Sequence, residues 1–458
     1  MAEEPQDILR RFASPSVRRS DAMDQLVRDA VFGDQGTRDR ARWLIWEIGQ
    51  QAGARPASIH ELYLARGRGE VSAFTTPAIN VRMMGYDTAR AIFRAAVRMD
   101  VGAVICEIAR SEIGYTEQRP AEYVAVITAA ALREGFDHPI FIQGDHVQVN
   151  AKKYATDPAA ELSAIKALID EEIHAGFYNI DVDTSTLVDL SQKTLDEQQR
   201  VNFERAAELT QYIRQREPKG VTISVGAEIG EVGGKNSDVH ELKAFMGGYE
   251  RTRHHLGVKH GISKISVQTG TSHGGVVLPD GTIAKVQLDL AALKELSQEA
   301  RSIYGLGGAV QHGASTLPPD AFSNFPLCEA VEIHLATNFQ TMVFDHPKLP
   351  QALRAEVNAW VKAECKEEWK KGDTEEQFIY KSRKKAIGPF KKKFWDLPAD
   401  IRQAIGADLE KTFAFLFEQL RVGNTRAATD RFVKPPLDSH AAPRMAAVAA
   451  PDDLEAGE

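Results

Sequence analysis

The sequence predicts a TIM-type (β/α)8 barrel, an α/β fold, with helical extensions at both ends. From about Phe74, short apolar runs alternate with longer helix-like segments, which is the pattern of repeated βα units. Eight such runs fall within roughly 260 residues, the size of a TIM barrel. A doubly wound open sheet would instead spread the strand ends apart. The predicted strands span residues 75–81, 103–108, 139–144, 178–182, 221–225, 264–269, 308–311 and 331–336.

The barrel is predicted to occupy residues 71–346, with a different pattern on each side of it. Residues 1–70 carry apolar residues three or four apart and are predicted to form an N-terminal helical extension. Residues 347–432 are rich in charge, with aromatic residues at helical spacing, and predict a C-terminal helical extension. Residues 433–458 are rich in Ala, Pro and acidic residues, which favours a disordered tail.

Composition excludes several classes of function. A formal net charge of -8 argues against nucleic acid as a partner, because binding the phosphate backbone requires an excess of Lys and Arg. The three cysteines lack C-x-x-C spacing, so we expect a reducing compartment. No leader pattern or membrane-length apolar run is present, and we therefore predict a cytoplasmic protein with no membrane partner. The aromatic residues of the extensions predict a homo-oligomer, a dimer or larger.

Three histidines follow predicted strands inside short Gly-rich or acidic motifs. These are Gly144-Asp145-His146, Gly270-Thr271-Ser272-His273-Gly274 and His312-Gly313-Ala314-Ser315. Strand ends in a barrel meet at one face, so the three imidazoles are expected to converge there. Three neutral imidazoles suit a Zn²⁺ site with an open position, although cobalt, manganese or iron would also be accepted. The sequence therefore predicts a catalytic metal held by His146, His273 and His312.

Other polar residues at the strand ends predict the chemistry around that metal. Asp145 adjoins His146, and alternation along a strand would turn the two side chains in different directions. Asp145 is thus a candidate acid/base group; the alternative is that it caps a helix or orients a ligand. Backbone amides and hydroxyls at Gly274, Gly313, Ser315 and Thr337 are candidates for holding a phosphate, where the alternative is ordinary helix capping.

The chain resembles the class II, metal-dependent ketose-bisphosphate aldolases over roughly Phe74 to Phe344. The order and approximate spacing of several motifs agree with that family. The matched segments are residues 78–81, 144–146, 180–185, 227–230 with 232–234, 270–274, 312–315 and 335–337.

The resemblance implies cleavage of a ketose bisphosphate, most simply fructose 1,6-bisphosphate, through a metal-stabilised enediolate. It implies that Asp145 exchanges a proton with the hydroxyl that becomes the aldehyde oxygen. Glu228 matches a catalytic-site glutamate near the metal, where it could serve as an alternative ligand, and Asn80 matches a substrate contact. His334 lies among the substrate contacts as well. A monovalent cation beside the substrate is also compatible with the family.

Some positions depart from the family pattern. Lys235-Asn236-Ser237-Asp238 stands where the family carries a loop glutamate, so the second base is unassigned within 235–241. His334 replaces a family asparagine and Ala109 a family serine, both around the substrate. His334 could reshape the carbonyl end of the pocket or form a hydrogen bond inside the barrel.

Two other functions remain open from the sequence. The flanks resemble the large companion subunit of tagatose-bisphosphate aldolase, which suggests a non-catalytic partner barrel, although three metal ligands argue against that hypothesis. A metal-dependent ketose or ketose phosphate epimerase is the other alternative, because a cleaved pair can rejoin with inverted stereochemistry. The basic run from Lys381 to Lys393 is interpreted as a solvated helix face with one packed side; the alternatives are a nucleic-acid contact or a phosphate clamp supplied by a neighbouring subunit.

Overall fold

The computed structural model describes residues 4–230, 236–270 and 288–443, and it contains a closed barrel of eight parallel strands. Each predicted apolar run overlaps one barrel strand, so the predicted (β/α)8 fold is confirmed. Hydrogen bonds between β4 and β5 close the ring that begins at β2 and returns through β9. The barrel strands are β2 (Thr76–Asn80), β3 (Ile105–Ala109), β4 (Ile140–Gln148), β5 (Asn179–Asp183), β6 (Ser224–Glu228), β7 (Lys264–Val267), β8 (Ala309–Gln311) and β9 (Glu332–Leu335).

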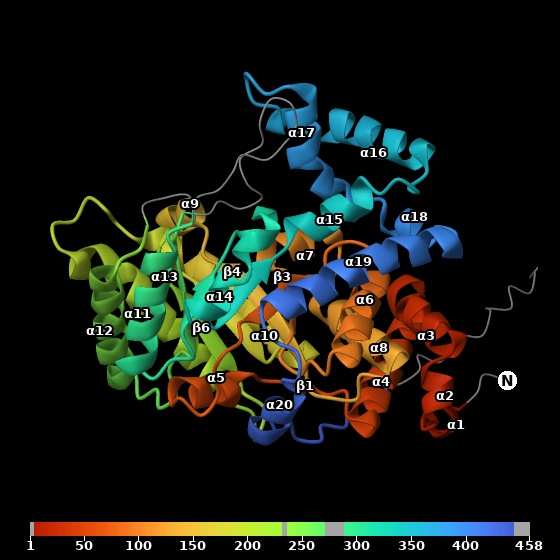
Figure 1. Cartoon of the computed structure of the whole chain (residues 1–458), viewed down its shortest axis with the longest axis horizontal. Coiled ribbons are helices and arrows are strands. Elements are labelled where there is room, and N and C mark those ends of the chain that lie inside the picture. The colour runs from red at the N-terminus through yellow and green to blue at the C-terminus, as the bar shows by residue number, and fades with distance from the viewer. Residues whose placement is uncertain (1–3, 231–235, 271–287, 444–458) are drawn as a thin grey trace, which may run out of the picture.

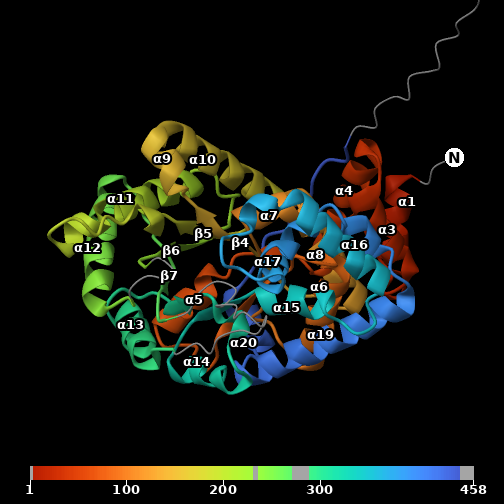
Figure 2. The ribbon, with the colours of Figure 1, turned by 90° about the horizontal axis from the view of Figure 1, so that it is seen from above.

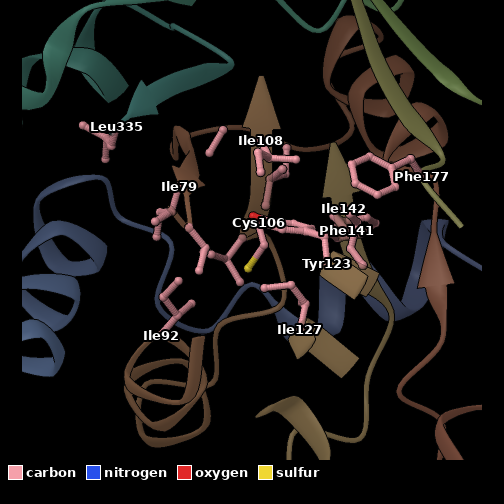
Figure 3. Packing of buried hydrophobic residues seen from close by; sticks show 14 of the residues in the cluster. Ile79, Ile92, Cys106, Ile108, Tyr123, Ile127, Phe141, Ile142, Phe177 and Leu335 are labelled. Carbon is pink, nitrogen blue, oxygen red and sulfur yellow. The ribbon is translucent and has the colours of Figure 1, made fainter. Parts of the chain in front are cut away.

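Helices follow the strands and surround the barrel, as Figure 2 shows from above. They are α6 (Gly85–Arg98), α7 (Arg110–Thr116), α8 (Pro120–Glu134), α9 (Ala151–Thr156), α10 (Pro158–Ala175), α11 (Leu195–Arg214), α12 (Val239–His255), α13 (Leu290–Ser302), α14 (Asn324–Leu327) and α15 (Thr337–Phe344), with 3-10 turns at Ser185–Leu187, Ala314–Thr316 and Pro319–Ala321. Apolar side chains fill the layer between strands and helices. Figure 3 shows part of it, where Cys106 of β3 gathers with Ile92 of α6 and Ile127 of α8.

Helical segments precede and follow the barrel, in agreement with the helix patterns of residues 1–70 and 347–432. The first group is α1 (Pro5–Phe12), α2 (Pro15–Arg18), α3 (Asp21–Phe32), α4 (Gln35–Ala52) and α5 (His60–Gly67), with the short strand β1 (Pro56–Ala57) beside β4. The second is α16 (Gln351–Glu364), α17 (Glu375–Ser382), α18 (Lys391–Trp395), α19 (Ala399–Gln419) and α20 (Arg426–Phe432), with 3-10 turns at Lys366–Glu368 and Arg383–Ala386. In Figure 1, α16 and α17 lie above the barrel, whereas α5 and α20 lie at its opposite end.

The first part of the expected disordered tail is bound to the N-terminal extension. Residues 433–443 have no regular secondary structure, yet backbone groups of this stretch pair with side chains of α4. The Trp46 indole donates to the Asp438 carbonyl at 2.7 Å, and the His440 ring stacks on Trp46 with centroids 4.7 Å apart. The composition of residues 433–443 does not predict this contact, because its partners are tryptophans on a helix far away in the sequence. The remainder of the expected tail, 444–458, lies outside the described residues.

A buried carboxyl at the outer wall of the barrel makes stability depend on pH. Glu172 of α10 is fully buried against Gly144, and neither of its carboxyl oxygens has a hydrogen-bond partner among the residues that the structure describes. Burial raises the pKa of Glu172 to about 8, and Arg119 opposes the shift only in part.

We expect Glu172→Gln to raise the free energy of unfolding at pH 8 by several kcal/mol and to have little effect near pH 4. The folded protein keeps the Glu172 proton up to pH near 8 while the unfolded chain releases it near the ordinary value of 4.5, so stability falls as pH rises between these two values. Denaturant unfolding at several pH values measures the difference. Glu171→Gln, which removes a partly exposed neighbour paired with Arg119, is the matched control. Equal pH slopes for Glu172→Gln and the wild type would contradict the assignment.

Candidate metal and substrate site

The carboxyl ends of the strands surround a cavity of about 840 Å³ that opens towards α17. Strands β2, β4 and β9 contribute Asn80, Asp145, His146 and His334 to its wall. The loops after β8 and β9 add Gly313, Ser315 and Thr337. Seven of the predicted site residues therefore line one cavity, although they span more than 250 positions of the chain.

A bulge in β4 turns Asp145 and His146 towards the same space. The register of β4 against β5 shifts between Gly144 and Val147, and His146 has a left-handed φ of 43°. Such a bulge re-aims side chains that strict alternation would place on opposite faces. The expectation that these two neighbours point in different directions was wrong for this reason. A non-glycine residue in this conformation is strained, and strain of this kind is commonly found at functional sites.

Two of the three predicted metal-binding histidines converge. Nε2 of His146 and Nδ1 of His312 lie 2.5 Å apart, and the rings meet edge to face. The opposite nitrogen of His146 contacts Asp183 at 3.1 Å, and that of His312 contacts the Ser266 hydroxyl at 3.1 Å. Metal-binding histidines commonly have an oxygen partner of this kind on the second nitrogen, which orients the ring. Both facing nitrogens belong to one group of possible metal ligands, and they would have to separate to about 3.3 Å to bind one tetrahedral Zn²⁺ through bonds of about 2.0–2.1 Å.

Carboxylates surround this pair. Glu228, at the end of β6, lies 3.5 Å from Nδ1 of His146 and 4.0 Å from Nδ1 of His312. Burial, together with the negative charge of Asp183, raises the pKa of Glu228 well above its ordinary value. Asp145, His146 and His312 form one group with ligand atoms within 4.8 Å of one another, and His146, Asp183 and Glu228 form another. The third predicted histidine, His273, and the predicted phosphate-binding Gly274 lie outside the described residues.

Asp145 is held at both carboxylate oxygens. Oδ1 lies 3.0 Å from Nδ1 of His334, and Oδ2 accepts a hydrogen bond from the Asn80 amide at 3.1 Å. Burial alone would raise the pKa of Asp145, but the charges of His146 and His334 outweigh it and lower the pKa well below its ordinary value. This shift favours the ionised carboxylate of Asp145. The alternative that it caps a helix does not agree with these contacts.

His334 lines the cavity and also contacts carboxylates inside the barrel, which agrees with the second of the two alternatives from the sequence. Its second nitrogen, Nε2, lies 2.6 Å from Glu332. Burial would lower the pKa of His334, but the charges of Glu107 and Asp145 raise it well above its ordinary value. Glu332, Glu107 and Lys264 were not predicted. Their strands read as ordinary apolar runs, and only the inward face of the closed barrel brings them together.

The candidate phosphate residues lie together at the loops after β8 and β9. The Ser315 hydroxyl accepts from the backbone amides of Ala336 at 2.7 Å and Thr337 at 3.3 Å. Ser315 therefore links the two loops and caps the start of α15, which was the alternative to phosphate binding. Both Ser315 and Thr337 still face the cavity with Gly313, whose φ of 66° suits glycine.

Positive side chains line the outer part of the cavity, and sequence reasoning missed most of them. They are Arg82, Arg110, Lys153, Lys381 and Lys384. Arg82 pairs with Glu112, whereas Lys153 and Lys384 have no carboxylate partner within the described parts of the chain. Lys384 lies beside Tyr115, 5.7 Å from the ring centre, and burial with the nearby charge of Arg82 lowers the pKa of Lys384. Lys384 is half-buried and Arg383 is buried, so these two residues lie on the packed side of the basic run, and Phe390, Phe394 and Trp395 are buried as expected.

The described end of the loop that should supply a second base has another role. Asp238 caps α12 by accepting from the amides of His240 at 2.9 Å and Glu241 at 3.0 Å. The Ser237 hydroxyl accepts from the amide of Gln268 at 3.0 Å. Lys235 lies outside the described residues, so the second base is unassigned.

Comparison with known proteins identifies the family of the chain. The family described as fructose-bisphosphate aldolase class-II matches residues 69–387. The chain belongs to this family. Membership of this family assigns the chain as a metal-dependent aldolase. The cluster around His146 and His312 is a site where a metal can bind. No curated protein matches the sequence.

The solved structures to which the chain is similar have low sequence identity with it. A protein from Sinorhizobium meliloti 1021, described as a probable tagatose 6 phosphate kinase, is 18% identical with a TM-score of 0.50, over 78% of this chain and 93% of that one. A fructose-bisphosphate aldolase from Campylobacter jejuni is 16% identical with a TM-score of 0.44, over 82% and 95%. A fructuronate-tagaturonate epimerase from Cohnella laeviribosi is 12% identical with a TM-score of 0.47, over 86% of each chain.

Among the described residues, every helix is too short or too polar to cross a membrane.

Proposed function

We propose that this protein is a class II aldolase that cleaves a ketose bisphosphate, most simply fructose 1,6-bisphosphate, to dihydroxyacetone phosphate and glyceraldehyde 3-phosphate. One observation carries the proposal: a carboxylate held for proton transfer, Asp145, adjoins the converging imidazoles of His146 and His312. Cation-binding and proton-accepting groups must be near each other when the bond between the α and β carbons of a β-hydroxy ketone breaks.

The residues would divide the work as follows. A divalent ion such as Zn²⁺ at His146, His312 and His273, with Glu228 within reach, would polarise the ketose carbonyl and stabilise the charge that develops there. Asp145 would accept the proton of the C4 hydroxyl as the C3–C4 bond breaks and C4 becomes an aldehyde carbon. The electron pair of the broken bond would pass to the three-carbon fragment, which then takes up a proton at C3. Asn80 would keep the Asp145 carboxylate directed at the hydroxyl.

The two ends of the cavity support a substrate with two anionic groups. Gly313, Ser315 and Thr337, with Gly274 outside the described residues, would receive one phosphate. Lys384 and Lys153 are candidates for the second, because they line the same cavity and have no carboxylate partner among the described residues. An anion beside Lys384 would also offset the burial that now lowers its pKa.

We expect Lys384→Ala to raise KM for fructose 1,6-bisphosphate about 10- to 100-fold, since a hydrogen bond to a charged group contributes about 1.5–3 kcal/mol. KM for fructose 1-phosphate and kcat should change little, because the lost contact would be to the distal phosphate, which is the C6 phosphate that fructose 1-phosphate lacks. Steady-state cleavage of both sugars measures this. Lys385→Ala is the matched control, as Lys385 pairs with Glu368 and does not line the cavity. An equal loss for both sugars would exclude Lys384 as a distal phosphate contact.

A substrate panel tests the function itself. Metal-loaded protein should cleave a ketose bisphosphate and release triose phosphates, detected by coupled oxidation or reduction of the triose. An inverted ketose without free triose would identify an epimerase instead. Absence of activity on every ketose mono- and bisphosphate, in protein that binds no metal, would favour the companion-subunit hypothesis.

A further inference from the structure

A buried charged network lies inside the barrel beneath the proposed site. Glu332 of β9 is fully buried and accepts hydrogen bonds from Lys264 at 2.5 Å, Gln143 at 2.9 Å and Tyr63 at 2.5 Å. TIM-barrel interiors are usually filled by layers of branched apolar side chains. Charges buried in their place are costly to desolvate and are weak evidence for stability. A network of this kind next to a reactive carboxylate calls for a role beyond holding the barrel together.

His334 connects this network to Asp145. It follows Glu332 by two positions on β9, so both side chains point to the barrel interior. Nε2 of the imidazole lies 2.6 Å from Glu332, and Nδ1 lies 3.0 Å from Asp145. An imidazole contacted at both nitrogens cannot turn about its ring axis without losing one contact. The orientation of His334, and through it that of Asp145, therefore depends on Glu332.

We propose that Glu332 is a positioning residue that, through His334, fixes the Asp145 carboxylate in the orientation that accepts the substrate hydroxyl proton. The inference rests on the proposed aldolase function and goes beyond it, because Glu332 itself does not line the cavity. The rigidity of Glu332 comes from its three donors outside the site. Tyr63 belongs to α5, so the N-terminal extension contributes to the geometry of the site.

The connection from Glu332 through His334 to Asp145 is called the relay below. A double-mutant cycle of Glu332→Gln and His334→Asn tests it. Each single change should lower kcat for ketose bisphosphate cleavage about 10- to 100-fold, the usual effect of losing a partner that orients a ligand or reacting group. KM should stay within about twofold of the wild type, since neither change removes a phosphate contact. Because both residues act through one carboxylate, the double variant should be no slower than the slower single variant.

Folding is controlled within the same set. In Glu332→Gln, Lys264 keeps Asp181 at 3.0 Å, so its ammonium stays paired. Circular dichroism and thermal unfolding should show a folded protein. Glu134→Gln, which removes a carboxylate from the distant pairs with Arg90 and Arg94, is the matched control and should keep full kcat. Unchanged kcat in folded Glu332→Gln, or independent multiplicative effects in the double variant, would overturn the proposal.

A spectroscopic measurement distinguishes failure of the relay from failure of the aldolase function. In metal-loaded protein labelled with ¹⁵N at its 13 histidines, the His334 ring signal is identified by its loss in His334→Asn. Glu332→Gln and Asp145→Ala should each shift that signal, and Glu134→Gln should not. A wild type without aldolase activity would count against the proposed function only, and the ring signal would then decide the relay. A His334 signal unmoved by either substitution would exclude the relay in any case.

Discussion

Replacing Asp145 with alanine should lower kcat for ketose bisphosphate cleavage by about 10²–10⁴-fold, the usual contribution of a positioned acid/base group. The carboxylate lies in the cavity wall with both oxygens held, by Asn80 and His334, and a pKa well below its ordinary value keeps it ionised. Alanine leaves the C4 hydroxyl without an acceptor for its proton. KM should change much less than kcat, because the phosphate contacts are elsewhere in the cavity.

The metal content of Asp145→Ala distinguishes a role as base from a role as metal ligand. Asp145 lies within reach of the His146 and His312 nitrogens, so it is also a candidate ligand. If Asp145 is the base, Asp145→Ala should bind as much metal as the wild type, measured by elemental analysis of the purified protein. Loss of metal together with activity would make it a ligand instead, and unchanged turnover would remove it from the mechanism. Asp196→Ala, at an exposed ion pair with Arg251, is the matched control.

Removing the metal should reduce kcat/KM by at least about 10³-fold, because charge stabilisation by a bound ion is worth several kcal/mol and each 1.36 kcal/mol is a factor of ten. We expect the same loss on treatment with a chelator and in His312→Ala, in which one of the two converging imidazoles is absent. Progress curves of triose phosphate release measure both.

Adding metal back distinguishes the chelated wild type from His312→Ala. Added Zn²⁺, cobalt, manganese or iron should restore the chelated wild type but not His312→Ala, and the ion that restores most activity identifies the metal. His138→Ala is the control for loss of a buried histidine, because His138 contacts Asp430 and does not line the cavity. Full activity in protein shown to be metal-free would refute metal dependence.

The barrel could be predicted from the sequence because each strand is a short apolar run that is bordered by Gly and charged residues. The β4 bulge could not, since strict alternation is the default for a strand and the register shift arises from pairing with β5. The association of 433–443 with α4 was equally hidden, because the stretch is polar and its partners, Trp43 and Trp46, lie nearly 400 positions earlier.

The candidate site and the barrel interior beneath it also combine residues that the sequence predicts with residues that it does not. His146, His312 and Asp145 stand in motifs dense enough to be read in the chain, and the structure brings them together. Lys384 stands in a run of basic residues that looks like any solvated helix, and only the position of the turn after α17 over the strand ends places it at the cavity. Glu332 and Lys264 carry no motif at all.

The sequence by itself determined the fold class and supplied candidate site residues, several of which the structure brings to one cavity, because periodicity and motif density are local properties of the chain. The tertiary structure decided which way those side chains point, which residues they contact, and which Lys and Arg side chains line the cavity. These depend on distances between residues on different strands and helices. Closure of the barrel sets those distances, and no local pattern encodes them.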